Sequence, residues 1–207
     1  MLRVNSLSGF GAGAGYFKDN FNDNSQNTNL WSKTSFFGNN ASVTVVETGG
    51  SVTITPLSST AGSNTNGYQA IKAYNMTSKY LYIEVPTVTA NDANAQLRFG
   101  MLSDSSNFFC FIKASTTLTF RVTTAGTPSD VNITYDATNH RWMRMLQSGS
   151  NILFDTSADS VTWTNRRSVA NPSFGVTVLK PFFLAGTTGS SASPGTAVFD
   201  NFISNLT

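Results

Sequence analysis

Residues 135–164 read YDATNHRWMRMLQSGSNILFDTSADSVTWT, and this stretch decides the fold. It predicts three short strands, each with a large aromatic or aliphatic residue. A turn at Gly149-Ser150 joins the first two strands, and a hairpin turn at residues 155–160 joins the second to the third. The stretch therefore indicates antiparallel β-structure.

The same period of two recurs along the rest of the chain. Apolar residues alternate with polar ones in residues 43–55, 80–85 and 117–122. Segments rich in Gly, Ser, Asn and Pro separate these runs, and no window carries a sustained 3.6-residue apolar period. Only a single helical turn is expected, at residues 23–27. Many short strands with frequent turns predict an all-β fold, a two-sheet antiparallel β-sandwich.

The two ends of the predicted sandwich are near-copies of each other. Residues 17–21 read FKDNF and residues 198–202 read VFDNF, as expected if the first and last strands lie side by side in one sheet. Together with Leu30-Trp31 and residues 135–164, this pattern resembles concanavalin A-like and laminin G-like jelly-roll domains over residues 17–205. The resemblance implies a jelly roll, a fold that serves lectins, glycanases, adhesion modules and bacteriophage virion proteins alike.

The chain divides into an N-terminal arm, residues 1–16, and a sandwich domain, residues 17–207. The arm is too rich in Gly and Ala to fill a core layer. It is either a loose terminus or an extended segment that becomes ordered on a neighbouring subunit, where small residues let two backbones approach closely. The candidate assembly residues are Leu2, Val4, Leu7, Phe10, Gly11, Gly13 and Gly15.

Composition excludes several partners. Charged residues make up 12% of the 207 and the net charge is +2, too little for a phosphate-binding stripe, so no nucleic acid partner is expected. No apolar run reaches the length of a membrane span or a signal peptide. The basic pair Arg166-Arg167 is expected on a solvated strand. Cys110 is the sole cysteine and is expected to be a packed, inert thiol.

The residues needed for catalysis are scarce. The resemblance implies that a glycanase of this fold would carry a Glu-x-Asp-x-x-Glu pattern on one strand, but Glu47 and Glu84 are the only glutamates and neither has an Asp at that spacing. His140 is the sole histidine, and it is expected in a turn. One His and one Cys cannot close a zinc site. We therefore predict that the chain is not an enzyme.

Calcium is the one metal that the residues suggest. The resemblance implies that a structural ion is held in some relatives near the sheet that joins the termini, and Asp19, Asp23 and Asp200 could supply oxygen ligands here. Asp and Asn beside strands form local hydrogen-bonded turns equally well. No other cofactor is expected.

Sugar binding is suggested by aromatic and arginine side chains. A sugar site presents aromatic rings to the apolar face of a pyranose and polar groups to its hydroxyls. Alternation in residues 141–146 puts Trp142 and Arg144 on one face of a strand, and Met143 and Met145 on the other. If the Met face is the core, the first pair forms a surface platform; the alternative is that Trp142 is core, as Trp163 is expected to be. Further candidates are Trp31, Tyr74 and Tyr80.

Two functions remain after these exclusions, beside a disfavoured secreted hydrolase. The first is a structural, decoration or fibre-type protein of a virus particle, indicated by the arm, the low charge and a start, residues 4–11, that is similar to those of phage structural proteins. Its partners would be capsid or tail proteins, in several copies or as a homo-oligomer. The second is a carbohydrate-binding module for surface glycans. The expected location is the virion after synthesis in a host cytoplasm, or otherwise outside the cell.

Overall fold

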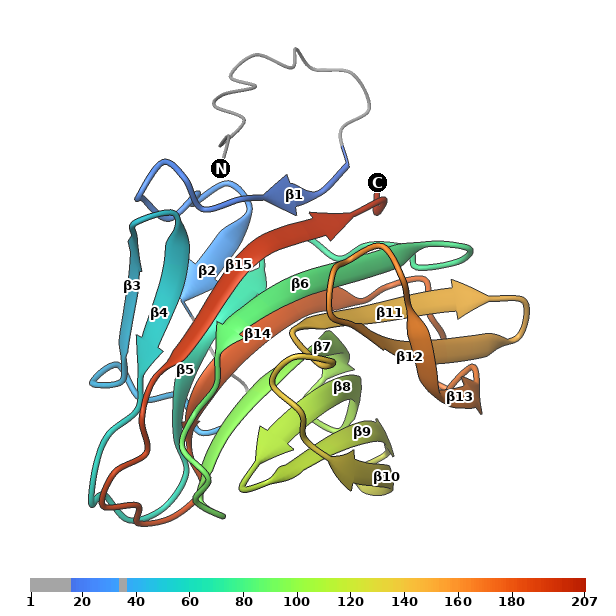
Figure 1. Ribbon diagram of the computed structural model, residues 1–207. Coiled ribbons are helices and arrows are strands. Elements are labelled where there is room, and N and C mark those ends of the chain that lie inside the picture. Colours follow the sequence, from blue (N-terminus) through green and yellow to red (C-terminus); the bar gives the residue numbers. More distant parts are fainter. Residues whose placement is uncertain (1–15, 34–36) are drawn as a thin grey trace.

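The computed structural model describes residues 16–33 and 37–207, which form two antiparallel β-sheets packed face to face (Figure 1). The predicted all-β sandwich is confirmed. The described residues contain no helix, so the helical turn expected at residues 23–27 is wrong. Side-chain hydrogen bonds hold turns there instead; Asp23 Oδ1, for example, accepts the Ser25 amide at 3.3 Å. The predicted assembly residues of the arm, all within residues 1–15, lie outside the described residues.

Sheet A contains the first and last strands of the described chain. Its order is β13-β12-β11-β6-β15-β4-β3, with β1 paired to β15. In that order the strands are Thr164–Ala170, Asn151–Ser157, Trp142–Ser148, Tyr80–Thr87, Ala197–Ser204, Ser51–Thr55 and Thr44–Thr48, and β1 is Lys18–Asp19. The pairing of Lys18 with Ile203 confirms that the two similar terminal segments lie side by side (Figure 1).

Sheet B is built from the middle of the chain. Its order is β10-β9-β8-β7-β14-β5-β2. In that order the strands are Thr127–Thr134, Thr117–Thr124, Asn107–Ala114, Ala95–Asp104, Lys180–Thr187, Asn64–Ala70 and Trp31–Lys33. Three consecutive hairpins, from β7 to β10, make up one half of this sheet.

The core lies between the sheets and is strongly aromatic. Phe111 and Phe120 of sheet B pack against Phe154 of sheet A, with ring centroids 5.3 and 5.9 Å from the Phe154 ring. Met143 and Met145 are fully buried, so the Met face of β11 is the core face. Interdigitated rings of this kind bury a large apolar area and hold the two layers in register.

The region 135–164 forms strands as predicted, with one shift. β11 and β12 form the expected hairpin at Gly149-Ser150. The third strand, β13, begins only at Thr164, because Asp159 Oδ1 accepts the amides of Val161 and Thr162 and holds those residues in a loop. That loop carries Trp163 over the outer surface of sheet A, which matters for the site below.

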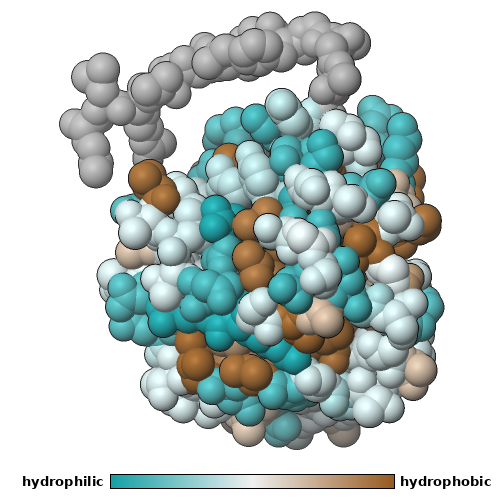
Figure 2. All heavy atoms as spheres, turned by 90° about the vertical axis from the view of Figure 1, so that its right-hand side faces the viewer, coloured by the Kyte–Doolittle hydropathy of each residue, from teal (hydrophilic) through white to brown (hydrophobic). Residues whose placement is uncertain are grey.

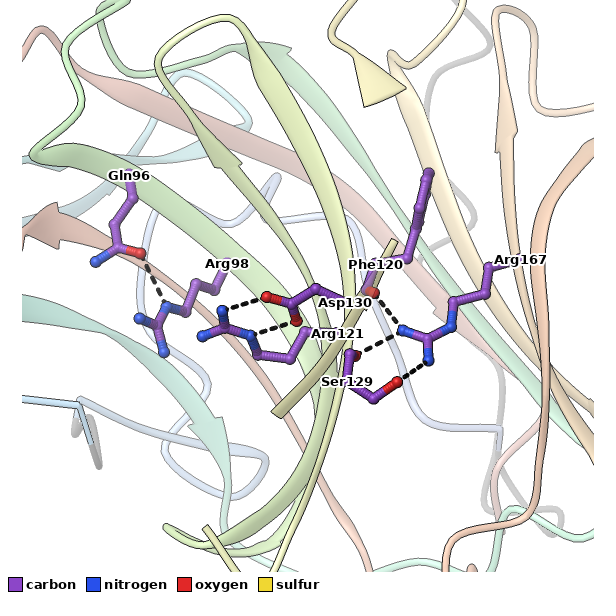
Figure 3. Close-up of polar contacts among 7 residues, drawn as sticks. All are labelled: Gln96, Arg98, Phe120, Arg121, Ser129, Asp130 and Arg167. Carbon is purple, nitrogen blue, oxygen red and sulfur yellow. Dashed lines mark hydrogen bonds and ion pairs between the residues drawn. The ribbon is translucent and has the colours of Figure 1, made fainter. Parts of the chain in front are cut away.

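Arg167 joins the edges of the two sheets. Its Nη1 donates to the carbonyl oxygens of Phe120 and Ser129 at 2.5 and 2.7 Å, and its Nη2 donates to Ser129 Oγ at 2.8 Å (Figure 3). The side chain is almost buried, so the prediction of a solvated basic pair at 166–167 is wrong for Arg167. Arg167 pairs with Phe154 of β12, and its side chain leaves β13 on the same, core-facing side, which directs the guanidinium toward the other sheet.

In the part of the chain that the structure describes, no helix has the length and apolarity needed to cross a membrane. Figure 2 shows one side of the molecule, where hydrophobic residues occur as small separate groups among polar and neutral ones.

Candidate functional site

A group of aromatic rings and one arginine lies on the outer face of sheet A. We call it the aromatic platform and define it as Tyr80 and Tyr82 from β6, Trp142 and Arg144 from β11, and Trp163 from the loop before β13. The alternating pattern of β6 and β11 explains its position, because the residues between these side chains are buried in the core. Every member is half-buried, so each ring keeps part of its surface open to solvent.

Tyr82 is the centre of the platform. Its ring centroid lies 5.9 Å from Tyr80, 6.0 Å from Trp142 and 5.4 Å from Trp163. The guanidinium carbon of Arg144 lies 4.3 Å from the Trp163 ring centroid, a cation–π contact. These contacts hold the rings in fixed positions on a rigid sheet, which lowers the entropy lost when a ligand binds.

A buried carboxylate orients Arg144. Its Nε and Nη2 donate to Asp155 Oδ2 at 3.0 and 2.8 Å, and Asn165 Nδ2 donates to Asp155 Oδ1 at 2.8 Å. The Asp155 side chain is 4% exposed, whereas that of Arg144 is 23% exposed. Such charge-assisted bonds are short and directional. Arg144 is therefore held with one edge toward Asp155 and part of its surface toward solvent.

Acidic residues border the platform on the side of Trp142. Trp142 pairs with Glu84, which in turn pairs with Asp200 of β15. Both oxygens of Glu84 are engaged, Oε1 by Arg141 at 2.6 Å and Oε2 by Asn201 at 2.8 Å. Burial, together with the nearby Glu84 charge, raises the pKa of Asp200 to about 6.

Three of the five predicted sugar-binding residues, Tyr80, Trp142 and Arg144, come together in the platform. Trp31 does not: it is 1% exposed, stacks on Tyr68 with centroids 5.9 Å apart, and donates from Nε1 to Asp19 at 2.8 Å. Tyr74 stacks on Phe17 at 4.9 Å and is packed against the core. The prediction for Trp31 is wrong, because a buried ring cannot contact a sugar. Tyr74 is half-buried and packs near the chain ends, so it is not part of the platform.

The placement of the tryptophans differs from the sequence prediction. Trp163, expected in the core, lies at the surface, where its neighbour Val161 is 80% exposed, and of the two positions left open for Trp142 the structure has the surface one. The sequence analysis missed Tyr82 and Asp155. Tyr82 could have been found, because it alternates with the buried Leu81 and Ile83, but the role of Asp155 depends on its cross-strand pairing with Arg144.

The three predicted calcium ligands do not form one cluster. Asp19 accepts the Phe21 amide and the Trp31 indole NH, and Asp23 accepts the Ser25 amide, whereas Asp200 lies with Glu84 and Arg141. Among the described residues, no group of three or more His, Cys, Asp or Glu side chains has a geometry that could hold a metal ion. Asp19 and Asp23 accept hydrogen bonds in local turns, and Asp200 accepts the Asn201 amide within β15.

His140 and Cys110 are both structural in the described fold. His140 Nδ1 accepts the Asp136 amide at 2.9 Å within a turn, as predicted, and burial lowers the pKa of the imidazole. Cys110 is fully buried, and burial raises the pKa of its thiol to about 12. A thiol in this state is a poor nucleophile at neutral pH, as expected from the sequence.

The outer face of sheet B has a different character. Six residues on it are 6% exposed or less and pack beneath Phe37: Leu102, Phe108, Cys110, Ile112, Phe182 and Leu184. Arg98 and Arg121 lie on the same face, and the latter is paired with Asp130 at 2.6 Å (Figure 3). The face is therefore mostly apolar and covered, with two guanidinium groups among its residues.

No protein family and no curated protein sequence matches the chain. Several solved structures have a similar fold. The CBM2 module of the evolved Dit of Lactobacillus casei BL23 phage J-1 has a TM-score of 0.66 and 12% identity, covering 92% of this chain and 95% of that one. SCLam, a non-specific endo-β-1,3(4)-glucanase from family GH16, has a TM-score of 0.65 and 10% identity, covering 91% and 89%. A GH16 protein of Bacteroides ovatus has a TM-score of 0.61 and 9% identity, covering 91% and 99%. At these identities the shared property is the fold, and the chain is a concanavalin A-like jelly roll, as the sequence resemblance implied.

Proposed function

We propose that this jelly roll is a non-enzymatic carbohydrate-binding module that is displayed on a virus particle. The observation that carries the carbohydrate part is the aromatic platform, in which half-exposed rings of Tyr82, Trp142 and Trp163 surround a fixed arginine. Aromatic faces pack against the CH groups of a pyranose, and a guanidinium donates hydrogen bonds to its hydroxyls. Structural neighbours that include a CBM2 module and glucanases support this choice of ligand.

The carboxylates of the described residues support a binding role over a hydrolytic one. Glycoside cleavage needs two carboxyl groups on either side of the scissile bond. No strand of the described chain carries more than one carboxylate, although Glu84 and Asp200 are cross-strand neighbours on β6 and β15 beside the platform. Glu47 faces the core, where Tyr68 donates to it, and Glu84 is bound by Arg141 and Asn201. The fold is shared with enzymes, so the absence of hydrolysis is part of the proposal.

Display on a particle is the second part of the proposal. The phage module among the structural neighbours comes from a Dit protein, and the Gly/Ala-rich arm of residues 1–16 suits docking against another subunit. Low charge with abundant Ser, Thr and Asn is compatible with a surface-displayed sandwich.

The carbohydrate part is tested by glycan-array screening followed by calorimetry on the strongest ligand. Trp142→Ala should weaken binding at least tenfold, about 1.4 kcal/mol. Tyr74→Ala is the matched control, since it removes an aromatic ring that packs against Phe17 away from the platform, and it should bind like the wild type. Circular dichroism must show both variants folded. Equal binding by Trp142→Ala and wild type would exclude the platform as the site.

Two further measurements test the rest. Purified protein should release no reducing ends from β-glucans; measurable release that disappears in Glu84→Gln would make the chain an enzyme.

Deleting residues 1–16 should leave the sandwich folded but abolish its incorporation into particles. Normal incorporation of the truncated chain would contradict anchoring by the arm.

A further inference from the structure

Arg98 is a cation without a carboxylate partner. Among the described residues, Arg121, Arg141 and Arg144 each form an ion pair, whereas Arg98 forms none. Its Nε donates to Gln96 Oε1 at 3.1 Å and its guanidinium lies 4.5 Å from the Phe37 ring centroid, so the side chain is held in one place. Its two terminal nitrogens donate to no described group.

Gln96 supplies an unused donor beside Arg98. The two residues are two apart on β7 and face the same side of sheet B. Gln96 is 4% exposed, and its Nε2 has no hydrogen-bond partner. Burying an amide nitrogen without a partner is costly, so the Gln96 amide is a donor that a bound acceptor could satisfy.

Arg121 places a second positive charge nearby. β8 lies between the strands of Arg98 and Arg121, and Cys110 of β8 pairs with Gly100 on one side and Arg121 on the other. Figure 3 shows the two guanidinium heads next to each other, with Asp130 bound to Arg121 alone. The Arg121 charge also contributes to lowering the pKa of Arg98, after the larger effect of burial. Two cations therefore lie on this part of sheet B with one carboxylate, which is bound to Arg121.

Two glycines, Gly100 and Gly186, lie on the strands beside these donors. A Cβ on Gly100 would lie 2.4 Å from the Phe109 carbonyl oxygen, and a Cβ on Gly186, the cross-strand neighbour of Gln96, would lie 2.1 Å from that of Asn64. The positions next to the donors are therefore restricted to glycine. A ligand group above them would meet backbone and not a side chain.

We propose that Gln96 and Arg98, with Arg121 across β8, bind an oxyanion, the carboxylate or sulfate group of an acidic polysaccharide. This inference rests on the proposed carbohydrate binding and adds a second site, for a charged group of the glycan, on the face of the sandwich opposite the platform. A guanidinium binds such groups through two parallel hydrogen bonds, and the amide of Gln96 donates a third. The site is compact, unlike the long basic stripe that nucleic acid binding uses, which favours a glycan.

Calorimetry with defined oligosaccharides tests the proposal. The probes are an oligogalacturonate, a sulfated carrageenan oligosaccharide, a neutral β-glucan oligosaccharide and a single-stranded oligonucleotide. We expect one or both acidic oligosaccharides to bind at least tenfold more tightly than the neutral one, and the stronger of the two identifies the anion. Tighter binding of the oligonucleotide, or equal binding of acidic and neutral sugars, would overturn it.

Gln96→Glu is the decisive variant. It keeps the size of the side chain but sets a carboxylate against Arg98, so it should weaken the acidic oligosaccharide at least tenfold and leave the neutral one unchanged. Lys72→Gln, which removes an exposed lysine charge elsewhere, is the control and should bind as the wild type does. Loss of all glycan binding in Trp142→Ala with full acidic binding in Gln96→Glu would keep the proposed function and reject this inference.

A ligand-independent readout separates the two proposals. Sodium sulfate, compared with sodium chloride at equal ionic strength, should raise the melting temperature of the wild type more than that of Gln96→Glu. This shift is expected even if no glycan on the array binds. An identical sulfate response in both proteins would contradict an oxyanion site at Arg98.

Discussion

The outer faces of the two sheets differ in how far their side chains are exposed and in how their charged groups are paired. On sheet A, half-exposed rings alternate with charges that are paired, as in Arg144 with Asp155 and Arg141 with Glu84. On sheet B, apolar residues are nearly fully buried beneath Phe37, and Arg98 has no acid partner. One face is therefore open with its polar groups satisfied, while the other is covered with polar groups unsatisfied.

The unsatisfied groups make this contrast informative. Three of the six buried side-chain atoms without a hydrogen-bond partner lie on the outer face of sheet B: Gln69 Oε1, Gln96 Nε2 and Thr123 Oγ1. Alternation along the strands puts these residues opposite the core. These three atoms are therefore buried on an outer face of the sandwich.

The largest expected effect is on stability and tests whether sheet B is covered. Phe108 lies on the outer face of sheet B but is 5% exposed, with its ring 4.8 Å from that of Phe37. Phe108→Ala should cost roughly 3–5 kcal/mol, as a core substitution does. Tyr82→Ala on the open face should cost less, about 1–2 kcal/mol, because part of its side chain is already exposed to solvent. Urea unfolding measures both, and equal costs would remove the distinction between the faces.

The next effect concerns the paired charges of sheet A. Arg144→Met should cost about 2 kcal/mol, since it leaves the buried Asp155 carboxylate with Asn165 as its only side-chain partner. Adding Asp155→Asn should recover part of that loss by removing the buried charge, which a double-mutant cycle in urea resolves. No recovery would show that the arginine acts through packing on Trp163 alone.

A smaller effect is a difference in pH dependence. Burial raises the pKa of Asp200 on sheet A from 3.8 to about 6, so its stabilising contribution is complete below pH 3.8 and is lost as the pH rises through 6. Asp200→Asn should therefore gain about 1 kcal/mol relative to wild type between pH 4 and 7, after allowance for solvent screening.

Asp130 on sheet B is the control with the opposite sign. The hydrogen bonds from Arg121 lower the pKa of Asp130, so its contribution is present above pH 3.8 and is lost as the pH falls below it. Asp130→Asn should destabilise the protein at pH 7 and become neutral in acid. Parallel pH profiles for the two variants would contradict the assigned environments.

The smallest effect is expected for the ion pair of Arg121. Its side chain and that of Asp130 are 27% and 29% exposed, so water screens the attraction. Arg121→Met should cost about 0.5 kcal/mol, and high salt should reduce that cost. A cost as large as that of Arg144→Met would show that the outer face of sheet B is drier than its exposure suggests.

Local patterns predicted much of this molecule. The alternation in residues 43–55 and 80–85, and the similarity of the two terminal segments, identified strands, buried faces and the pairing of β1 with β15. Alternation also offered the platform orientation of Trp142 and Arg144. The same reasoning misplaced Trp163, because the Asp159 turn that lifts it onto the outer face is a matter of backbone conformation and not of period.

The sequence by itself determined which residues alternate along each strand, because the side chains of a strand point to opposite faces in turn. Only the tertiary structure decided what those faces meet. Lys113, near the end of β8, is fully buried, with its ammonium donating to the carbonyl oxygens of Thr89 and Ala90. Arg98 and Arg144 are both outward-facing arginines. The partner strand of its own hairpin gives Arg144 the Asp155 carboxylate, whereas the strands that pair with β7 give Arg98 none.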